Sequence, residues 1–193
     1  MAFTDRMACI LLCAGRSTRF VGGNKLNADL CGKPVGQHMT DVLGTFPFVQ
    51  RVAVVATGEF RPLAASFDIV ETDDPLAGMG TSLSLGMNFV GHDSESVLVA
   101  LADMPFVSAR HVSSLFDGYE RTGGVVASSI DATAMPPAIF PAAYFGDLLA
   151  SEGDTGARRL LGQASLVQAA PDELLDIDTI EDLHRARTLL RRN

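Results

Sequence analysis

The sequence has no apolar run close to the roughly 18 residues that a membrane-spanning helix requires. Its longest apolar runs, such as Met7–Ala14, have the length of a strand. Cysteine is also scarce: there are three, an odd number, with no CxxC pair and no metal-site spacing. We therefore expect a soluble, cytoplasmic protein with reduced thiols and no membrane partner.

Positively charged residues are also fewer than negatively charged ones. The chain has 15 Lys and Arg residues against 23 Asp and Glu residues, a net charge of −8. This disfavours binding to nucleic acid or to an anionic membrane, because both attract a positive surface. The balance is reversed between Gly15 and Leu26, where Arg16, Arg19 and Lys25 stand without an acidic residue. A cationic loop in an acidic protein predicts a small anionic ligand.

The 193 residues show no internal repeat and no linker-like change of composition, so we expect one domain over residues 1–193. Strand-like and helix-like patterns alternate, which predicts an α/β fold with a mostly parallel sheet. Because the strand-like runs are continuously apolar, helices should cover both faces in a three-layer, Rossmann-like arrangement. The expected strands are Ala8–Cys13, Arg51–Ala56, Asp68–Thr72, Val97–Leu101 and Val125–Ser129, and the expected helices are Val35–Leu43, Thr81–Asn88 and Ala109–Tyr119.

Two later segments depart from this rhythm. Pro136-Pro137 lacks the N–H groups that a central strand donates, so we expect Ala138–Phe140 to be an edge strand or irregular, and to shape a second substrate pocket. Near the C-terminus, Thr179 to Asp182 has the pattern of a capping box, and the following apolar residues share one helical stripe. This predicts a packed terminal helix.

The segment Leu12–Leu26 is the strongest candidate for chemistry. It follows the first expected strand, and ligands of open α/β sheets bind beyond the carboxyl ends of strands. Its glycines let backbone amides approach phosphate oxygens, while Arg19 and Lys25 neutralise phosphate charge. It has neither a GxGxxG pattern nor the Gly-Lys-Ser/Thr ending of a P-loop, which weighs against a dinucleotide redox protein or a P-loop ATPase. The alternative is a solvated loop with scattered basic residues.

A second candidate is Asp103, which follows the apolar run Val97–Leu101 and precedes Pro105. It would lie at the same sheet edge as the glycine-rich segment. A carboxylate there suits Mg²⁺, which takes one or two protein carboxylates together with phosphate oxygens and water. The alternative is an Asp that only caps the following turn. The two features together favour an Mg²⁺-dependent enzyme acting on phosphates.

At these residues the sequence resembles the nucleotidyltransferases that mature the molybdenum cofactor. The first segment reads Leu12-Cys-Ala-Gly-Arg-Ser-Thr-Arg-Phe20 and then Gly22-Gly-Asn-Lys-Leu26. Ala14 before Gly15 resembles the cytidylyltransferase branch, since guanylyltransferases usually carry glycine there. Further matches cover nearly the whole chain: Gly32-Lys-Pro-Val35, Asp74-Pro75, Gly78-Met-Gly-Thr-Ser-Leu83, Ala102-Asp-Met-Pro105, Gly153-Asp-Thr-Gly-Ala-Arg158 and Asp176-Ile-Asp-Thr179.

The resemblance implies a nucleotidyltransferase fold and transfer of CMP from CTP to the phosphate of molybdopterin, with release of pyrophosphate. It implies catalytic roles for Arg19, Lys25 and Asp103, and an Mg²⁺ site at Asp103 and Asp178. The implied nucleotide-binding residues are Leu12, Cys13, Ala14, Gly15, Ser17, Lys25, Asp74, Gly78, Thr81 and Ser82, and the implied acceptor-binding residues are Asp154, Gly156 and Arg158.

Three positions depart from the family pattern: Cys13 replaces an alanine, Asp74 stands where asparagine is common, and Val21 is an inserted residue. We expect a monomer or weak dimer that passes its product to a recipient molybdoenzyme. The alternatives are a guanylyl or sugar-phosphate nucleotidyltransferase, and a non-catalytic nucleotide or pterin chaperone of a molybdoenzyme. Pyrophosphate release with each nucleotide would separate them.

Overall fold

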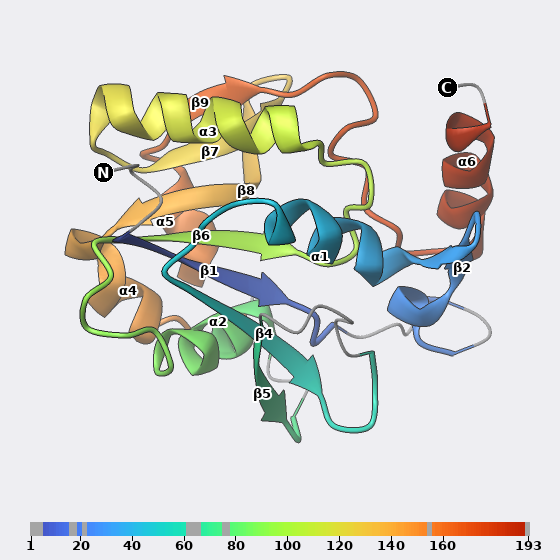
Figure 1. Ribbon diagram of the computed structural model, residues 1–193, viewed down its shortest axis with the longest axis horizontal. Coiled ribbons are helices and arrows are strands. Elements are labelled where there is room, and N and C mark those ends of the chain that lie inside the picture. Colours follow the sequence, from blue (N-terminus) through green and yellow to red (C-terminus); the bar gives the residue numbers. More distant parts are fainter. Residues whose placement is uncertain are drawn as a thin grey trace.

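The computed structural model describes residues 6–15, 19–20, 23–60, 67–74, 78–153 and 156–191. A seven-stranded sheet in the order β5-β4-β1-β6-β8-β7-β9 runs through its centre (Figure 1). All pairings are parallel except those of β8, which runs antiparallel to both neighbours. The strands are β1 (Met7–Leu12), β4 (Gln50–Ala56), β5 (Asp68–Thr72), β6 (Ser96–Leu101), β7 (Val126–Ile130), β8 (Thr133–Pro141) and β9 (Ser165–Gln168).

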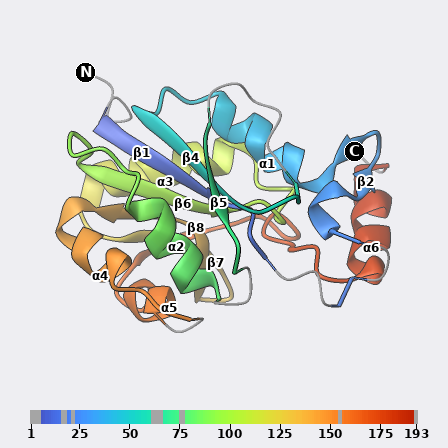
Figure 2. The ribbon, with the colours of Figure 1, turned by 90° about the horizontal axis from the view of Figure 1, so that it is seen from below.

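Helices cover both faces of the sheet, which confirms the three-layer fold. On one face lie α1 (Val35–Gly44) and α3 (Ala109–Thr122) (Figure 1). On the other lie α2 (Met79–Met87), α4 (Phe145–Leu149) and α5 (Gly156–Leu161) (Figure 2). Strand β1 contributes side chains to the core on each face of the sheet, because alternate side chains of a strand point to opposite faces. Met7, Cys9 and Leu11 join the core under α1 and α3, while Ala8, Ile10 and Leu12 join the core under α2.

The last helix, α6 (Ile180–Leu190), stands at the carboxyl edge of the sheet beside the small hairpin of β2 (Asp29–Leu30) and β3 (Lys33–Pro34) (Figure 1). Its start is the predicted capping box: the Thr179 hydroxyl accepts from the Asp182 amide, and the Asp182 carboxylate accepts from the Thr179 amide. No helix in the described part of the chain is long and apolar enough to cross a membrane.

The expectation for the double proline was wrong, because β8 is an interior strand between β6 and β7. The β7–β8 register shifts at this point: Ala127 pairs with Ala138 but Ser128 pairs with Met135. Pro136 and Pro137 therefore lie between paired positions, and neither has to donate a hydrogen bond. Strand β6 pairs with β8 only from Ala138 onward. The Ser128 hydroxyl donates to the Pro137 carbonyl at 2.8 Å.

Close packing of α2 on the sheet generates a stability prediction. A Cβ on Gly86 would lie 2.9 Å from Val54 Cγ2 and 3.0 Å from Ile10 Cγ2. Gly86→Ala should lower the free energy of unfolding by about 1–3 kcal/mol through overpacking. Gly44→Ala is the matched control, since a Cβ there has no described atom within 4 Å. Urea denaturation of both variants tests this, and an equal effect at the two glycines would contradict it.

Candidate active site

Four predicted residues meet at the carboxyl edge of the sheet. The Lys25 Nζ atom lies 2.6 Å from Asp103 Oδ2 and 2.6 Å from Asp178 Oδ1. An Arg19 guanidinium nitrogen lies 2.5 Å from the other oxygen of Asp178. The fold thus brings the glycine-rich segment, the end of β6 and the start of α6 into one cluster.

Local structure positions Lys25, Asp103 and Asp178. Lys25 opens a 3₁₀ turn, Lys25–Asn27, that begins with an Asn24 cap: the Asn24 Oδ1 atom accepts from the Leu26 amide at 2.8 Å. Asp103 is the second residue after β6, and its carbonyl accepts from the Ile177 amide at 2.9 Å. That bond ties the residue before Asp178 to the end of β6. These contacts fix the backbone next to Lys25, at Asp103 and before Asp178.

The electrostatics favour a charged Lys25. The residue is only 5% exposed, and burial favours the neutral amine. The charges and hydrogen bonds of Asp103 and Asp178 outweigh burial, so the pKa of Lys25 is raised. Lys25 is thus a permanent cation held between two carboxylates.

One oxygen of the cluster is left without compensation. Asp103 Oδ1 is buried and has no hydrogen-bond partner among the described residues. A buried carboxylate oxygen without a partner costs free energy, so it points to a donor or cation supplied by a ligand. No group of three or more His, Cys, Asp or Glu side chains in the described ranges is spaced to hold a metal. Two carboxylates beside a phosphate site are nonetheless the donor set that suits Mg²⁺, which draws its remaining ligands from phosphate and water.

Sequence reasoning gave no role to Asp176, which lies at one end of a cavity next to the cluster. Partial burial raises the pKa of Asp176, and the charges of Asp103 and Asp178 raise it further. The signal in the sequence is the alternation Asp176-Ile177-Asp178. Ile177 is fully buried, so its two neighbours face away from the core.

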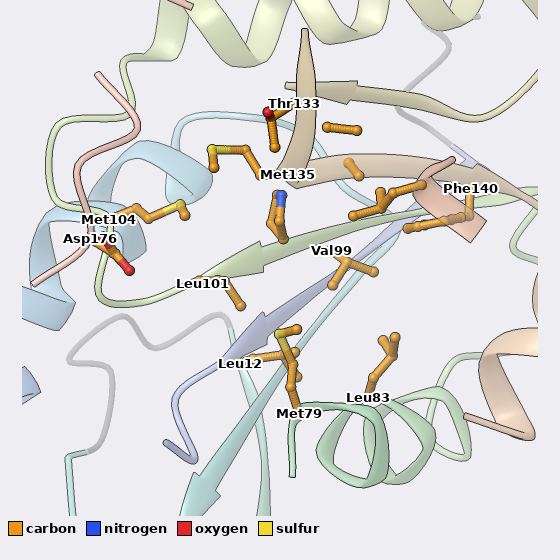
Figure 3. A pocket seen from close by; sticks show the side chains of 14 residues that line it. Leu12, Met79, Leu83, Val99, Leu101, Met104, Thr133, Met135, Phe140 and Asp176 are labelled. Carbon is orange, nitrogen blue, oxygen red and sulfur yellow. The ribbon is translucent and has the colours of Figure 1, made fainter. Parts of the chain in front are cut away.

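The cavity itself has a volume of about 390 Å³ and lies between α2 and β8 (Figure 3). Its lining is mostly apolar and rich in methionine, with Thr133 and Asp176 as polar side chains (Figure 3). Pro136 also lines it, so the double-proline segment does border a pocket; that the pocket holds a substrate remains a prediction. The main apolar lining residues are Leu12, Met79, Leu83, Met104, Met135 and Phe140.

The first residues of the glycine-rich segment divide between core and surface. Leu12 lines the cavity, whereas the Cys13 side chain is buried, and burial raises the pKa of its thiol. Ala14 is half-buried and Gly15 is exposed. Gly15 has no positive φ, and a Cβ there would meet no described atom within 4 Å. Packing of the described residues therefore gives no reason for a glycine, whereas close approach of a ligand would. Ser17 and the inserted Val21 lie outside the described residues.

The predicted nucleotide-binding and acceptor-binding segments come into contact. The Gly80 amide donates to the Gly153 carbonyl at 2.6 Å, and a Cβ on Gly80 would lie 2.5 Å from that oxygen. Gly78, with φ of +91°, precedes α2 and turns the chain into it. Ser82 is buried and its hydroxyl donates back to the Gly78 carbonyl at 3.5 Å, so its side chain belongs to the helix.

The structure says less about the remaining predicted residues. Asp74 and Thr81 are exposed beside these segments. Asp154 lies outside the described residues. Gly156 and Arg158 belong to the first turn of α5, and their side chains are outside the described part. The acceptor-binding role of these three residues therefore stays a prediction.

The fold and the Lys25 cluster define a nucleotidyltransferase-like α/β protein, with basic and carboxylate groups at the carboxyl ends of parallel strands. Residues 9–169 match the family model described as a MobA-like NTP transferase domain. The chain belongs to this family. Its relatives include the purine catabolism protein PucB of Bacillus subtilis, 30% identical over 92% of this chain and 94% of that protein.

Another relative is a probable molybdenum cofactor guanylyltransferase of Haloferax mediterranei, 24% identical over 91% of this chain and 90% of that protein. Among solved structures, the Mycobacterium sp. strain JC1 homologue of Mycobacterium tuberculosis Rv0371c has a TM-score of 0.79 at 23% identity, covering 98% of this chain and 99% of that one. Rv0371c from strain H37Rv, in complex with manganese, has a TM-score of 0.74 at 21% identity, covering 95% and 98%. These likenesses show the shared fold.

The charge cluster generates a pKa prediction. Asp103→Asn removes a negative charge that raises the pKa of Asp176, so this pKa should fall. It should stay above its ordinary value, because burial is the largest cause of the shift. Carboxyl ¹³C chemical shifts followed through a pH titration measure it. As a control, Asp41→Asn, which removes the exposed partner of Lys33, should leave the pKa of Asp176 unchanged. An equal pKa of Asp176 in Asp103→Asn and in the wild-type protein would show that the charge of Asp103 does not act on Asp176.

Proposed function

We propose that this protein transfers CMP from CTP to the phosphate of molybdopterin and releases pyrophosphate. The observation that carries the proposal is the buried Lys25 ammonium between Asp103 and Asp178, where Asp103 Oδ1 has no hydrogen-bond partner in the described part of the chain. Membership of the MobA-like NTP transferase family supports the reaction class.

Lys25 and Arg19 are suited to the triphosphate. The Arg19 side chain is 72% exposed, so it can turn from Asp178 to a phosphate at little cost. Lys25 is buried and fixed, which makes it a stationary charge beside the reacting phosphorus. A preorganised cation of this kind stabilises the charge that develops in the transition state.

Asp103 and Asp178 are the residues that would hold Mg²⁺. When bound there, the ion would neutralise charge on the triphosphate and on the leaving pyrophosphate. The orphaned Asp103 oxygen and the two-carboxylate donor set fit this role. The manganese complex of Rv0371c is in keeping with a divalent ion in this fold.

The reaction needs no strong general base. A phosphate oxygen of the acceptor attacks the α-phosphorus of CTP and forms a new P–O bond. The bond from the α-phosphorus to the bridging oxygen breaks, and its electron pair leaves with pyrophosphate. Because the attacking phosphate is already anionic, catalysis reduces to positioning and charge stabilisation. This is why a cluster of Lys and Asp suffices without a His or Cys nucleophile.

The cavity supports a pterin acceptor over a sugar phosphate. Sugar hydroxyls need hydrogen-bond partners when buried, and among the described lining residues the polar side chains are those of Thr133 and Asp176. A flat ring with a few N–H groups fits an apolar slot with one carboxylate at its end. The contact between Gly80 and Gly153 would keep the acceptor side next to the nucleotide side. A recipient molybdoenzyme would then take the product.

The base is assigned to cytosine on Ala14, which lies directly after the strand and before the exposed Gly15. A guanylyltransferase is the second candidate, favoured by the Haloferax relative. Pyrophosphate release from each nucleoside triphosphate, with and without molybdopterin, separates the two. We expect release with CTP and molybdopterin. Release with GTP alone among the nucleotides would reassign the base, and binding of CTP without turnover would indicate a chaperone.

The role of Lys25 gives a mutational prediction. Lys25→Met should lower kcat/KM for CTP by about 10²-fold or more, because a buried stationary charge is lost from the transition state. Lys33→Met is the control, since Lys33 makes an exposed pair with Asp41 away from the cluster. Thermal melts of both variants report whether they fold. A folded Lys25→Met protein with near-normal kcat/KM would show that Lys25 has no catalytic role.

A further inference from the structure

A second polar network lies behind the cavity, on the side of α3. His111 is 4% exposed, and its Nε2 atom lies 2.8 Å from the hydroxyl of the fully buried Ser128. That hydroxyl donates its single proton to the Pro137 carbonyl at 2.8 Å. Toward His111, Ser128 is therefore the acceptor, and His111 Nε2 must carry the hydrogen. The imidazole thus reaches the irregular part of β8, whose neighbours Met135 and Pro136 line the cavity.

The other ring nitrogen faces the segment that leads to the active-site carboxylates. His111 Nδ1 lies 3.9 Å from Glu173 Oε2, too far for a hydrogen bond, and burial lowers the pKa of His111. The two residues are joined instead through Ser108, whose hydroxyl accepts from the His111 amide at 3.1 Å and donates to Glu173. The Glu173 carboxylate accepts from the Ser108 amide at 3.2 Å and the Ala170 amide at 3.0 Å, and also from the Ser108 hydroxyl. Burial opposes ionisation of Glu173, but these hydrogen bonds outweigh it and lower its pKa. Glu173 is therefore an anion, and its carboxylate holds the turn at residues 170–173 through the Ala170 amide.

From Glu173 the chain runs only a few residues to Asp176 and Asp178. The Ile177 amide donates to the Asp103 carbonyl at 2.9 Å, which fixes the far end of this stretch. One set of contacts therefore connects the β8 wall of the cavity to the segment that carries both carboxylates. Its members are Pro137, Ser128, His111, Ser108, Glu173 and Ala170.

We propose that His111 and Glu173 are positioning residues that set the β8 wall of the cavity against the Asp176–Asp178 segment, and thereby govern affinity for the acceptor. Among the described residues, no hydrogen bond or ion pair joins His111 to the nucleotide segment or the Lys25 cluster. Asp178 is held separately by its ion pairs with Lys25 and Arg19. The effect of losing His111 should therefore fall on the acceptor and spare CTP. This inference rests on the proposed function, because it assigns the acceptor to the cavity.

The test compares His111→Phe and His111→Gln in the full chain. Phenylalanine keeps the packing but removes the donor to Ser128, whereas a glutamine amide can replace that donor. In His111→Phe we expect KM for molybdopterin to rise about tenfold, as for loss of a residue that orients a site, with kcat changed less than about threefold and KM for CTP less than about twofold. His111→Gln should recover most of the loss.

Tyr119→Phe is the matched control. Tyr119 is buried on the same helix but shares its hydrogen bond with Ser96, at the opposite end of β6. This variant should lose stability without a change in either KM. If His111→Phe behaves like Tyr119→Phe, or if the KM values for CTP and molybdopterin rise together, His111 is only a core residue and the proposal is overturned.

Amide hydrogen exchange separates failure of this proposal from failure of the proposed function. Exchange at residues 170–178 should be faster in His111→Phe than in Tyr119→Phe, whether or not the wild-type protein transfers a nucleotide. If the wild-type protein releases no pyrophosphate from any nucleotide, the proposed function fails, and exchange alone decides the positioning role. Equal exchange rates in the two variants would refute it.

Discussion

The structure depends on the interaction of the buried Lys25 ammonium with Asp103 and Asp178. A buried ammonium without partners would be costly, and two adjacent carboxylates without a cation would repel each other. Each therefore requires the others, and together they connect the glycine-rich segment, the end of β6 and the start of α6. Asp103 Oδ1 has no hydrogen-bond partner among the residues that the structure describes, so this oxygen is available to a ligand.

The apolar cavity beside the cluster divides the site into two halves. Charge gathers on the side of Lys25, and apolar side chains of α2 and β8 gather on the other, with Asp176 at the boundary. The Gly80–Gly153 contact brings α2 and the predicted acceptor-binding segment within hydrogen-bond distance. Such an arrangement suits a reaction between a charged nucleotide and an acceptor that has a ring and a phosphate. The His111 network would hold the second half in register with the first.

The local pattern of residues was sufficient to predict much of the fold. The apolar runs that became β1, β4 and β6 are continuous and lie between turn residues, and the Thr179 capping box is specified by residues three apart. The interior position of β8 could not be predicted, because it depends on a register shift between strands β7 and β8 that no single segment encodes. Strand β9 was missed for another reason: it is short and mostly exposed, so it lacks an apolar run.

The site divides in the same way. Lys25 and Asp103 were predicted from residue type and position after a strand, and the structure brings them together. The burial of Cys13 and Ser82, the contact of Gly80 with Gly153 and the place of Asp176 depend on tertiary packing, which local sequence does not specify. The position of His111 could not be predicted, because its neighbours Ser128 and Glu173 are 17 and 62 positions away in the chain.

The most direct test of the account is Mn²⁺ binding in the presence of CTP and the absence of an acceptor, measured by electron paramagnetic resonance. We expect about one bound Mn²⁺ per chain for the wild-type protein, since Asp103 and Asp178 supply the carboxylates and CTP supplies phosphate oxygens. Asp103→Ala should lose this ion, while Asp41→Ala, at an exposed pair away from the cluster, should retain it. Undiminished Mn²⁺ binding by a folded Asp103→Ala protein would contradict the central claim.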